Sequence, residues 1–264
     1  MIRNNQLKSV DLKSFYDQAY DSGYKEFFTK YVNNKDTSET NNYLGKITNW
    51  SEKKVLDFGC GPGITAKFLS KKGAIVHGMD FSKKAIYEAE KLTNKNLSFS
   101  KGSVDDIKDN YDIIVSIGTI EHMENPEYAI KKFAKHLNQG GKLILTCPNW
   151  TNTNGYIQIA LYYLFNLKIT LSDLYFFSHY DFEKFALDFD MSLEDWFTYD
   201  HSLGNGELMI SDLRKRLKNI FKEDKSFDVE RTDRLINWLD SNKLYTKNTS
   251  NNGAMAMYIL KRIH

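Results

Sequence analysis

The chain has 264 residues, of which 41% are hydrophobic and 14% aromatic, enough to bury the core of one α/β domain with additions. Its acids and bases are interspersed with a formal net charge of +2, so we expect neither nucleic acid nor a membrane as partner. The N-terminus lacks the apolar segment of a signal peptide, and the longest apolar stretch, 156–167, is too short to span a bilayer. We expect a cytoplasmic protein with two reduced thiols, Cys60 and Cys147.

The first informative pattern is an apolar run that ends in a loop with glycine at every second position. Residues 55–63 read Val-Leu-Asp-Phe-Gly-Cys-Gly-Pro-Gly and are followed by a helical pattern. This is a strand, a tight turn and a helix N-terminus, the place where α/β sheets hold nucleotide-like ligands. A second apolar run, 74–79, ends in Asp80, whose carboxylate can bind both hydroxyls of a ribose.

Two interpretations of the glycine loop compete. An NAD site needs the spacing G-x-G-x-x-G, and Ile64 stands where its third glycine should fall. The loop preceded by Asp57 instead resembles motif I of the class I S-adenosylmethionine (SAM) methyltransferases. In that family the acid helps to hold the methionine end of SAM. The resemblance implies SAM as cofactor and S-adenosylhomocysteine as product.

Further apolar runs predict the other strands, at 97–100, 111–116, 142–147, 192–199 and 254–260. The resemblance implies an α/β fold, a Rossmann-like seven-stranded mostly parallel sheet of order 3-2-1-4-5-7-6 with helices on both faces. Residues 117–126 resemble the "LEHV.DP" turn of the ubiquinone-biosynthesis-like and type 11/12 small-molecule methyltransferases. Pro126 fits the first position of a helix that we expect to include Leu137 and to end near 139–141.

We expect one SAM-methyltransferase domain over 1–264, with an N-terminal helical cap at 1–50, a lid-like insertion at 150–180 and a helical insertion at 200–253 before the last strand. The aromatic 150–180 segment forms either a substrate wall or part of the core. In the 200–253 insertion we expect two apolar helix faces, one with Leu213, Leu217 and Ile220 and one with Leu235, Trp238 and Leu239. The basic run 214–218 is interpreted as a solvated face.

Several residues are expected to surround SAM because they match positions of the family. Residues 15–20 resemble the segment that folds over the bound cofactor, through Tyr16 or Tyr20. Where the family often has an acid for the adenine amino group, this chain has Ser103, so the contact passes to Asp105 or to the backbone at Val104. The full set is Tyr16, Asp57, Gly59, Cys60, Gly61, Asp80, Phe81, Ser103, Val104, Asp105, Ser116, Ile117 and His122.

Three histidines are candidates for a general base. His122, His179 and His201 follow the predicted strands four, five and six, at the carboxyl edge of the sheet, where ligands bind in open α/β folds. A neutral histidine that only hydrogen-bonds the substrate is the alternative for each of them. We expect no metal, because no set of acidic ligands is evident.

The acceptor is inferred largely from missing motifs. The stretch 116–119 lacks the Asn/Asp-Pro-Pro-aromatic motif of DNA methyltransferases, and the paired glutamates of arginine methyltransferases are absent. We therefore expect a methyltransferase that modifies a hydroxyl, less readily an amine, of a small polar metabolite such as a sugar or a surface-polysaccharide precursor. The alternative is a catalytically inactive SAM-binding sensor or assembly protein. A homodimer is left open.

Overall fold

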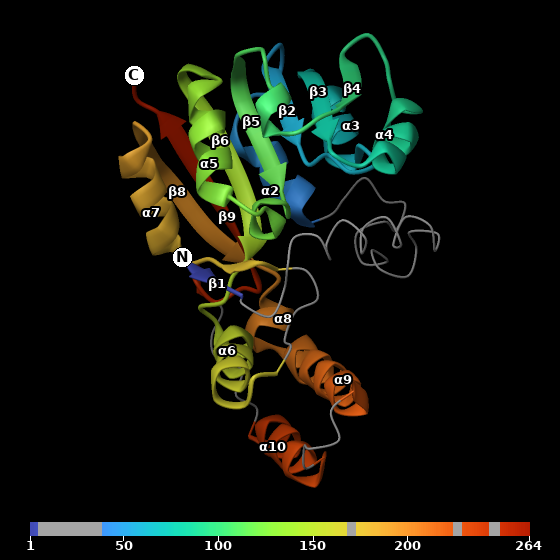
Figure 1. Cartoon of the computed structure of the whole chain (residues 1–264), viewed down its shortest axis with the longest axis vertical. Helices are drawn as coiled ribbons and strands as arrows, with labels where there is room; N and C mark the ends of the chain where they lie inside the picture. Colours follow the sequence, from blue (N-terminus) through green and yellow to red (C-terminus); the bar gives the residue numbers. More distant parts are fainter. Residues whose placement is uncertain (5–38, 168–172, 224–228, 243–248) are drawn as a thin grey trace. The chain divides into compact units, whose positions relative to one another are not determined.

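The computed structural model describes residues 1–4, 39–167, 173–223, 229–242 and 249–264 (Figure 1). Its main sheet has the strand order β4-β3-β2-β5-β6-β9-β8. Numbered along the chain within this sheet, the order is 3-2-1-4-5-7-6, which confirms the predicted α/β fold. The bounds are Lys54–Phe58 for β2, Ile75–Asp80 for β3, Leu97–Lys101 for β4, Tyr111–Ile117 for β5, Leu137–Pro148 for β6, Met191–Tyr199 for β8 and Met255–Arg262 for β9.

Strand direction brings the ends of the central strands to one edge. The pairs β2–β3, β3–β4, β2–β5 and β5–β6 are all parallel. Strand β9 runs antiparallel to β8, because Ala254 N donates to Asp200 O at 3.2 Å while Ile263 N donates to Asp190 O at 3.0 Å. A parallel strand covered on both faces needs a continuous apolar run, and Val55 and Leu56 are indeed both fully buried.

Helices connect the parallel strands. They are α3 (Ile64–Lys71), α4 (Lys83–Glu90) and α5 (Pro126–Lys135), with α2 (Glu39–Ile47) before the sheet and α7 (His179–Asp188) beside β8. Because the strand order reverses between β2 and β5, right-handed crossovers place α3 and α4 on one face and α5 on the other.

The predicted end of the helix that starts at Pro126 was wrong. Helix α5 ends at Lys135, and Leu137 already lies in β6, paired with Tyr111 of β5. An apolar residue at this position suits both a helix face and a strand, so periodicity alone does not separate the two. Pairing with the buried strand β5 decides in favour of the strand.

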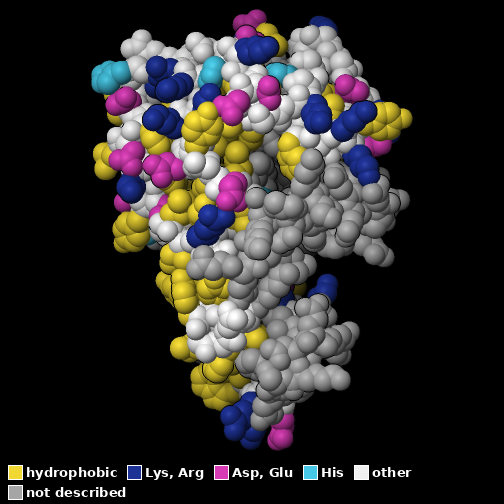
Figure 2. Space-filling model, viewed as in Figure 1, with side chains coloured by type: hydrophobic (Ala, Val, Ile, Leu, Met, Phe, Trp, Pro, Cys, Tyr) yellow, Lys and Arg dark blue, Asp and Glu magenta, His cyan; other side chains and the backbone are white. Residues whose placement is uncertain are grey.

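The chain divides into two compact units. The sheet unit contains the described residues of 39–147, 179–196 and 258–264, and the helical unit contains those of 1–4, 148–178, 197–223, 229–242 and 249–257. The single domain expected from the sequence stays a prediction. Figure 2 shows basic and acidic side chains mixed over the visible face, in line with the nearly balanced composition.

The helical unit consists of α6 (Thr153–Phe165), α8 (His201–Asn205), α9 (Glu207–Glu223) and α10 (Val229–Ser241), with β1 (Ile2–Arg3) paired antiparallel to β7 (Tyr175–Phe176). None of the helices in the described ranges is long and apolar enough to cross a membrane. The core of the helical unit is made of large apolar side chains, namely Tyr162, Leu167, Phe176, Met209, Ile210, Leu213, Leu217, Ile236 and Leu239.

The two apolar helix faces predicted for the insertion are only partly right. Leu213 and Leu217 are buried, and the side chain of Ile220 lies outside the described residues. On α10, Leu239 is buried, but Leu235 and Trp238 are 40% and 56% exposed. Ile236, three residues before Leu239, is buried instead, and periodicity does not distinguish it from Leu235, since residues three and four apart both lie near one helix face.

Two buried asparagines hold the end of β6 to the loop before β9. Asn149 Nδ2 donates to Asn251 O at 3.0 Å and Gly253 O at 2.9 Å. Asn152 Nδ2 donates to Gly253 O at 2.8 Å, while its Oδ1 caps α6 by accepting from Gly155 N at 2.8 Å. Gly253 tolerates no side chain here, since a Cβ would lie 2.1 Å from Tyr199 O.

We therefore expect Asn152→Ala to lower the free energy of unfolding by about 2–3 kcal/mol, because it removes a helix cap and leaves buried carbonyl groups with fewer partners. Asn125→Ala is the matched control: Asn125 caps α5 through one exposed hydrogen bond to Tyr128 N, and its loss should cost about 1 kcal/mol. Urea unfolding of both variants measures the difference. Equal losses would contradict the role given to Asn152.

Candidate functional site

The glycine loop after β2 has a backbone that other residues would strain. Gly59, Gly61 and Gly63 have φ values of 74°, 52° and 82°, in the left-handed region. A Cβ at Gly59 would lie 2.3 Å from the Thr119 hydroxyl, and one at Gly63 would lie 2.6 Å from the Phe99 ring. The predicted strand, loop and helix are confirmed, and close packing explains why two of the glycines carry no side chain.

Asp80 at the end of β3 fastens this loop. Its Oδ2 accepts from Gly61 N at 2.9 Å and its Oδ1 accepts from Ser82 N at 2.8 Å, just before α4. Burial raises the pKa of the Asp80 carboxyl, and these two hydrogen bonds work against that rise. Each carboxylate oxygen has two lone pairs, so both keep the capacity to accept one more hydrogen bond.

Asp57 in β2 is the most unusual group of the site. The residue is 1% exposed, and its Oδ2 has no hydrogen-bond partner among the described residues. Burial, with a smaller contribution from the negative charge of Asp80, raises the pKa of Asp57 to about 7, against the opposing effect of the Ala66 backbone N–H. A buried carboxyl oxygen without a hydrogen-bond partner lowers the stability of the fold unless a ligand supplies a donor, and an ammonium group can supply one.

The region after β4 uses its polar groups locally. Ser103 donates through both N and Oγ to Asp106 Oδ2 at 2.8 Å, which caps the short helix η1 (Val104–Asp106). The Asp105 carboxylate accepts from Tyr128 OH at 2.5 Å and pairs with Lys132 Nζ at 2.9 Å. Its side chain is therefore already engaged at the surface.

The turn after β5 contains Glu121, a buried acid that was not among the residues expected around SAM. Ser116 is fully buried with Oγ unpartnered in the described part of the chain, and Ile117 ends the strand. Glu121, in the short helix η2 (Ile120–His122), is 2% exposed, and its Oε1 lies 3.7 Å from His122 Nε2. The sequence contains a signal for this pair, because Glu121 stands directly before His122.

The other residues expected around the cofactor differ in exposure. Cys60 is buried, which raises the pKa of its thiol, and Phe81 is 47% exposed. Tyr16 and Tyr20 lie outside the described residues.

The candidate bases His179 and His201 belong to different units of the chain. His179 is the first residue of α7 in the sheet unit, where its ring stacks on Trp196 with centroids 4.5 Å apart. Its Nδ1 is buried without a hydrogen-bond partner among the described residues. His201 starts α8 in the helical unit, and its Nδ1 lies 3.0 Å from Asn252 Oδ1.

The neighbours of His201 determine its tautomer. Asn252 Oδ1 also accepts from the backbone Thr249 N–H at 3.0 Å, which identifies that atom as the acceptor oxygen. The proton of a neutral His201 therefore sits on Nδ1, and Nε2 carries the lone pair that can accept a proton.

Two curated relatives share sequence with this chain. The ubiquinone biosynthesis O-methyltransferase of Coxiella burnetii (strain Dugway 5J108-111) is 34% identical over 133 residues, 47% of this chain and 56% of that protein. That of Vibrio atlanticus (strain LGP32) is 27% identical over 157 residues, 56% of this chain and 66% of that protein. The chain thus spans between about half and two thirds of the length of these relatives.

Solved structures show the same fold at low sequence identity. Magnesium protoporphyrin IX methyltransferase from Synechocystis PCC 6803, with bound S-adenosylhomocysteine, is 16% identical with a TM-score of 0.54, covering 98% of this chain and 90% of that one. Phosphoethanolamine N-methyltransferase 2 from Haemonchus contortus, in complex with SAM, is 15% identical with a TM-score of 0.60, covering 96% and 60%.

A family model described as "Methyltransferase domain" matches residues 28–223, which is most of the chain. This match includes the glycine loop, the acids at the ends of β2 and β3, and the turn that holds His122. The resemblance inferred from these motifs is confirmed, and the chain belongs to the methyltransferase domain family.

Proposed function

We propose that this protein transfers the methyl group of SAM to a hydroxyl, less readily to an amine, of a small polar metabolite. The observation that carries the proposal is Asp57, a buried carboxyl beside a glycine loop with one oxygen that has no hydrogen-bond partner among the described residues. Family membership supports methyl transfer, and the names of the O-methyltransferase relatives favour oxygen as the acceptor atom.

The hydrogen bonds and burial of the groups at this sheet edge support the proposed cofactor contacts. Asp57 would accept from the ammonium group of SAM, and Asp80 would use its remaining lone pairs for the ribose hydroxyls. Because the Asp105 side chain is engaged with Tyr128 and Lys132, we assign the adenine contact to the backbone at Val104. The other residues proposed to line this site are Tyr16, Gly59, Cys60, Gly61, Phe81, Ser103, Ser116, Ile117 and His122.

SAM supplies a methyl group on a sulfonium that is already activated. The protein then has to position the acceptor and, for a hydroxyl, accept its proton. We propose His201 and His179 for that step: His201 presents Nε2 as acceptor, and His179 has an Nδ1 with no partner in the described residues.

Incubation with methyl-labelled SAM and matched panels of hydroxylated and amino metabolites, sugars and sugar nucleotides included, tests this function. Label in a hydroxylated product supports it. Label only in amines overturns the O-methyl assignment, and SAM binding without transfer to any acceptor would favour an inactive SAM-binding protein.

The first prediction concerns Asp57. Because its pKa is raised to about 7, the carboxyl is largely protonated at pH 6 and ionised at pH 8, and only the ionised form attracts an ammonium group strongly. SAM affinity should therefore increase between pH 6 and pH 8. Asp57→Asn should weaken SAM about 10–100-fold at pH 8 and flatten this pH dependence.

Calorimetric titrations at both pH values measure these effects. Asp109→Asn is the control, because it neutralises an acid whose side chain is 63% exposed and which pairs with Lys54. Wild-type affinity in a folded Asp57→Asn protein would remove the main support for the SAM site.

The second prediction concerns Asp80. Asp80→Ala removes both the proposed ribose contact and the bonds to Gly61 and Ser82, so SAM affinity should fall by about 2–3 kcal/mol. Asp188→Ala, at an exposed position at the end of α7, should leave affinity unchanged. Equal affinities of the two variants for SAM in the same titration would show that β3 does not border the cofactor.

The third prediction separates the histidines. Loss of a general base typically lowers the rate about 10²–10⁴-fold, so His179→Ala or His201→Ala should depress kcat while SAM affinity stays near wild type. His122→Ala should weaken SAM as well, because its turn follows β5 at the proposed cofactor edge. Paired measurements of Kd for SAM and of kcat decide this. If all three variants keep full turnover, none of these histidines is the base.

A further inference from the structure

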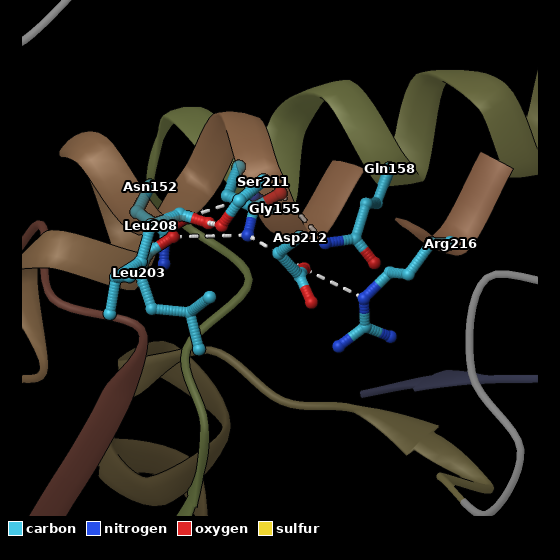
Figure 3. A network of polar contacts seen from close by, with 9 residues as sticks. Asn152, Gly155, Gln158, Leu203, Leu208, Ser211, Asp212 and Arg216 are labelled. Carbon is cyan, nitrogen blue, oxygen red and sulfur yellow. Dashed lines mark hydrogen bonds and ion pairs between the residues drawn. The ribbon is translucent and has the colours of Figure 1, made fainter. Parts of the chain in front are cut away.

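The helical unit contains a polar cluster where α6 faces α8 and α9, made of Asn154, Gln158, Asp212 and Arg216 (Figure 3). Gln158 Nε2 donates to Asn154 Oδ1 at 2.8 Å, and Asn154 Nδ2 donates to Leu203 O at 3.0 Å. On the other side, Arg216 Nε donates to Asp212 Oδ2 at 2.7 Å. Asn154 Nδ2, 3.5 Å from the same Asp212 oxygen, links the two halves of the cluster.

The chain of contacts fixes the orientation of both side-chain amides. The backbone oxygen of Leu203 can only accept, so the atom of Asn154 that faces it must be the NH₂ group. Its oxygen then faces Gln158, which must present its own NH₂ group in turn. The Gln158 Oε1 atom therefore points away from Asn154. Exchanging the oxygen and nitrogen of either amide would place two acceptors or two donors against each other, so this oxygen stays without a donor among the described residues in every sensible assignment.

This Oε1 atom is a buried acceptor with no hydrogen-bond partner in the described part of the chain. Gln158 is 6% exposed and Asn154 is 5% exposed. A second buried atom without such a partner, Nδ2 of Asn205, lies in α8, which packs against both α6 and α9. Buried polar groups are nearly always hydrogen-bonded, so two exceptions in one helix cluster point to a ligand.

The charges of the cluster indicate the kind of ligand. Asp212 and Arg216 form an ion pair at 2.7 Å, so the cluster carries no net charge for a charged ligand to neutralise. The available atom of the cluster is an acceptor, Gln158 Oε1. A hydroxyl group can donate to this oxygen without bringing a charge, whereas an ammonium group would bring a buried charge that the cluster does not balance.

We propose that Gln158 Oε1, within the helical unit, accepts a hydrogen bond from a neutral hydroxyl group of a small ligand. Such a site selects neutral hydroxylated molecules over charged amines.

Binding to the full chain can be measured by ligand-observed NMR with named probes. Catechol and myo-inositol supply neutral hydroxyl groups, 1,2-dimethoxybenzene has the catechol ring without donors, and ethanolamine supplies an ammonium group. We expect at least one hydroxylated probe to bind, and 1,2-dimethoxybenzene and ethanolamine to bind at least tenfold more weakly.

Gln158→Leu should weaken the hydroxylated probe about tenfold or more. It removes the buried Gln158 Oε1 but also the Nε2 donor of Asn154 Oδ1, so the two effects oppose each other and the melting temperature should change little. Gln139→Leu, the same change at an exposed position in β6, should leave probe binding unchanged. Gln158→Glu adds a negative charge and should improve ethanolamine binding about tenfold, which gives a second readout if the leucine variant does not fold.

The proposal is overturned if no hydroxylated probe binds the wild type, if Gln158→Leu binds the probe as well as the wild type does, or if ethanolamine is the preferred probe of the wild type. Calorimetry with SAM on the same samples separates the two proposals. SAM binding without probe binding refutes only the hydroxyl site. Probe binding that depends on Gln158 in a protein that neither binds SAM nor transfers methyl groups refutes the proposed function and leaves a hydroxyl site for another ligand.

Discussion

The carboxylate of Asp80 is the group on which the candidate site depends. Its two oxygens hold Gly61 N and Ser82 N, so one side chain at the end of β3 fixes both the glycine loop after β2 and the start of α4. The loop in turn packs so closely on its neighbours that Gly59 and Gly63 have no room for a Cβ. A ligand at this edge therefore meets a preformed backbone, which lowers the entropy lost on binding.

The protein keeps polar atoms in places where an apolar side chain would be more stable. Asp57 in the sheet unit is buried with a raised pKa, and Gln158 in the helical unit is buried with a carbonyl oxygen that no described residue satisfies. Leaving such groups unpaired costs about 1–3 kcal/mol each. Binding sites commonly retain a cost of this kind, because the same atoms stabilise the ligand when it arrives.

Asparagine has a separate, purely structural part in this chain. Asn149 and Asn152 satisfy the carbonyl groups of the loop before β9, and Asn152 also caps α6. A loop that is held by side-chain amides on both sides can approach β8 as closely as Gly253 does. The helical unit thus contains buried side-chain hydrogen bonds in addition to its apolar core.

The sequence by itself determined the glycine loop and the two acids, because these follow from short-range patterns: an apolar run, glycines at fixed spacing, an acid at a strand end. The order of the sheet was implied by the family resemblance that these motifs carry. The sequence did not determine where α5 stops, since Leu137 suits a helix as well as a strand and only pairing with Tyr111 decides. Nor did it separate Ile236 from Leu235 as the inward residue of α10. Only the tertiary structure showed that Asp105 is engaged with Tyr128 and Lys132, and that Glu121 lies against His122. It alone placed Asp212 next to Asn154, because this contact between α9 and α6 joins residues far apart in the chain, and no local spacing encodes it.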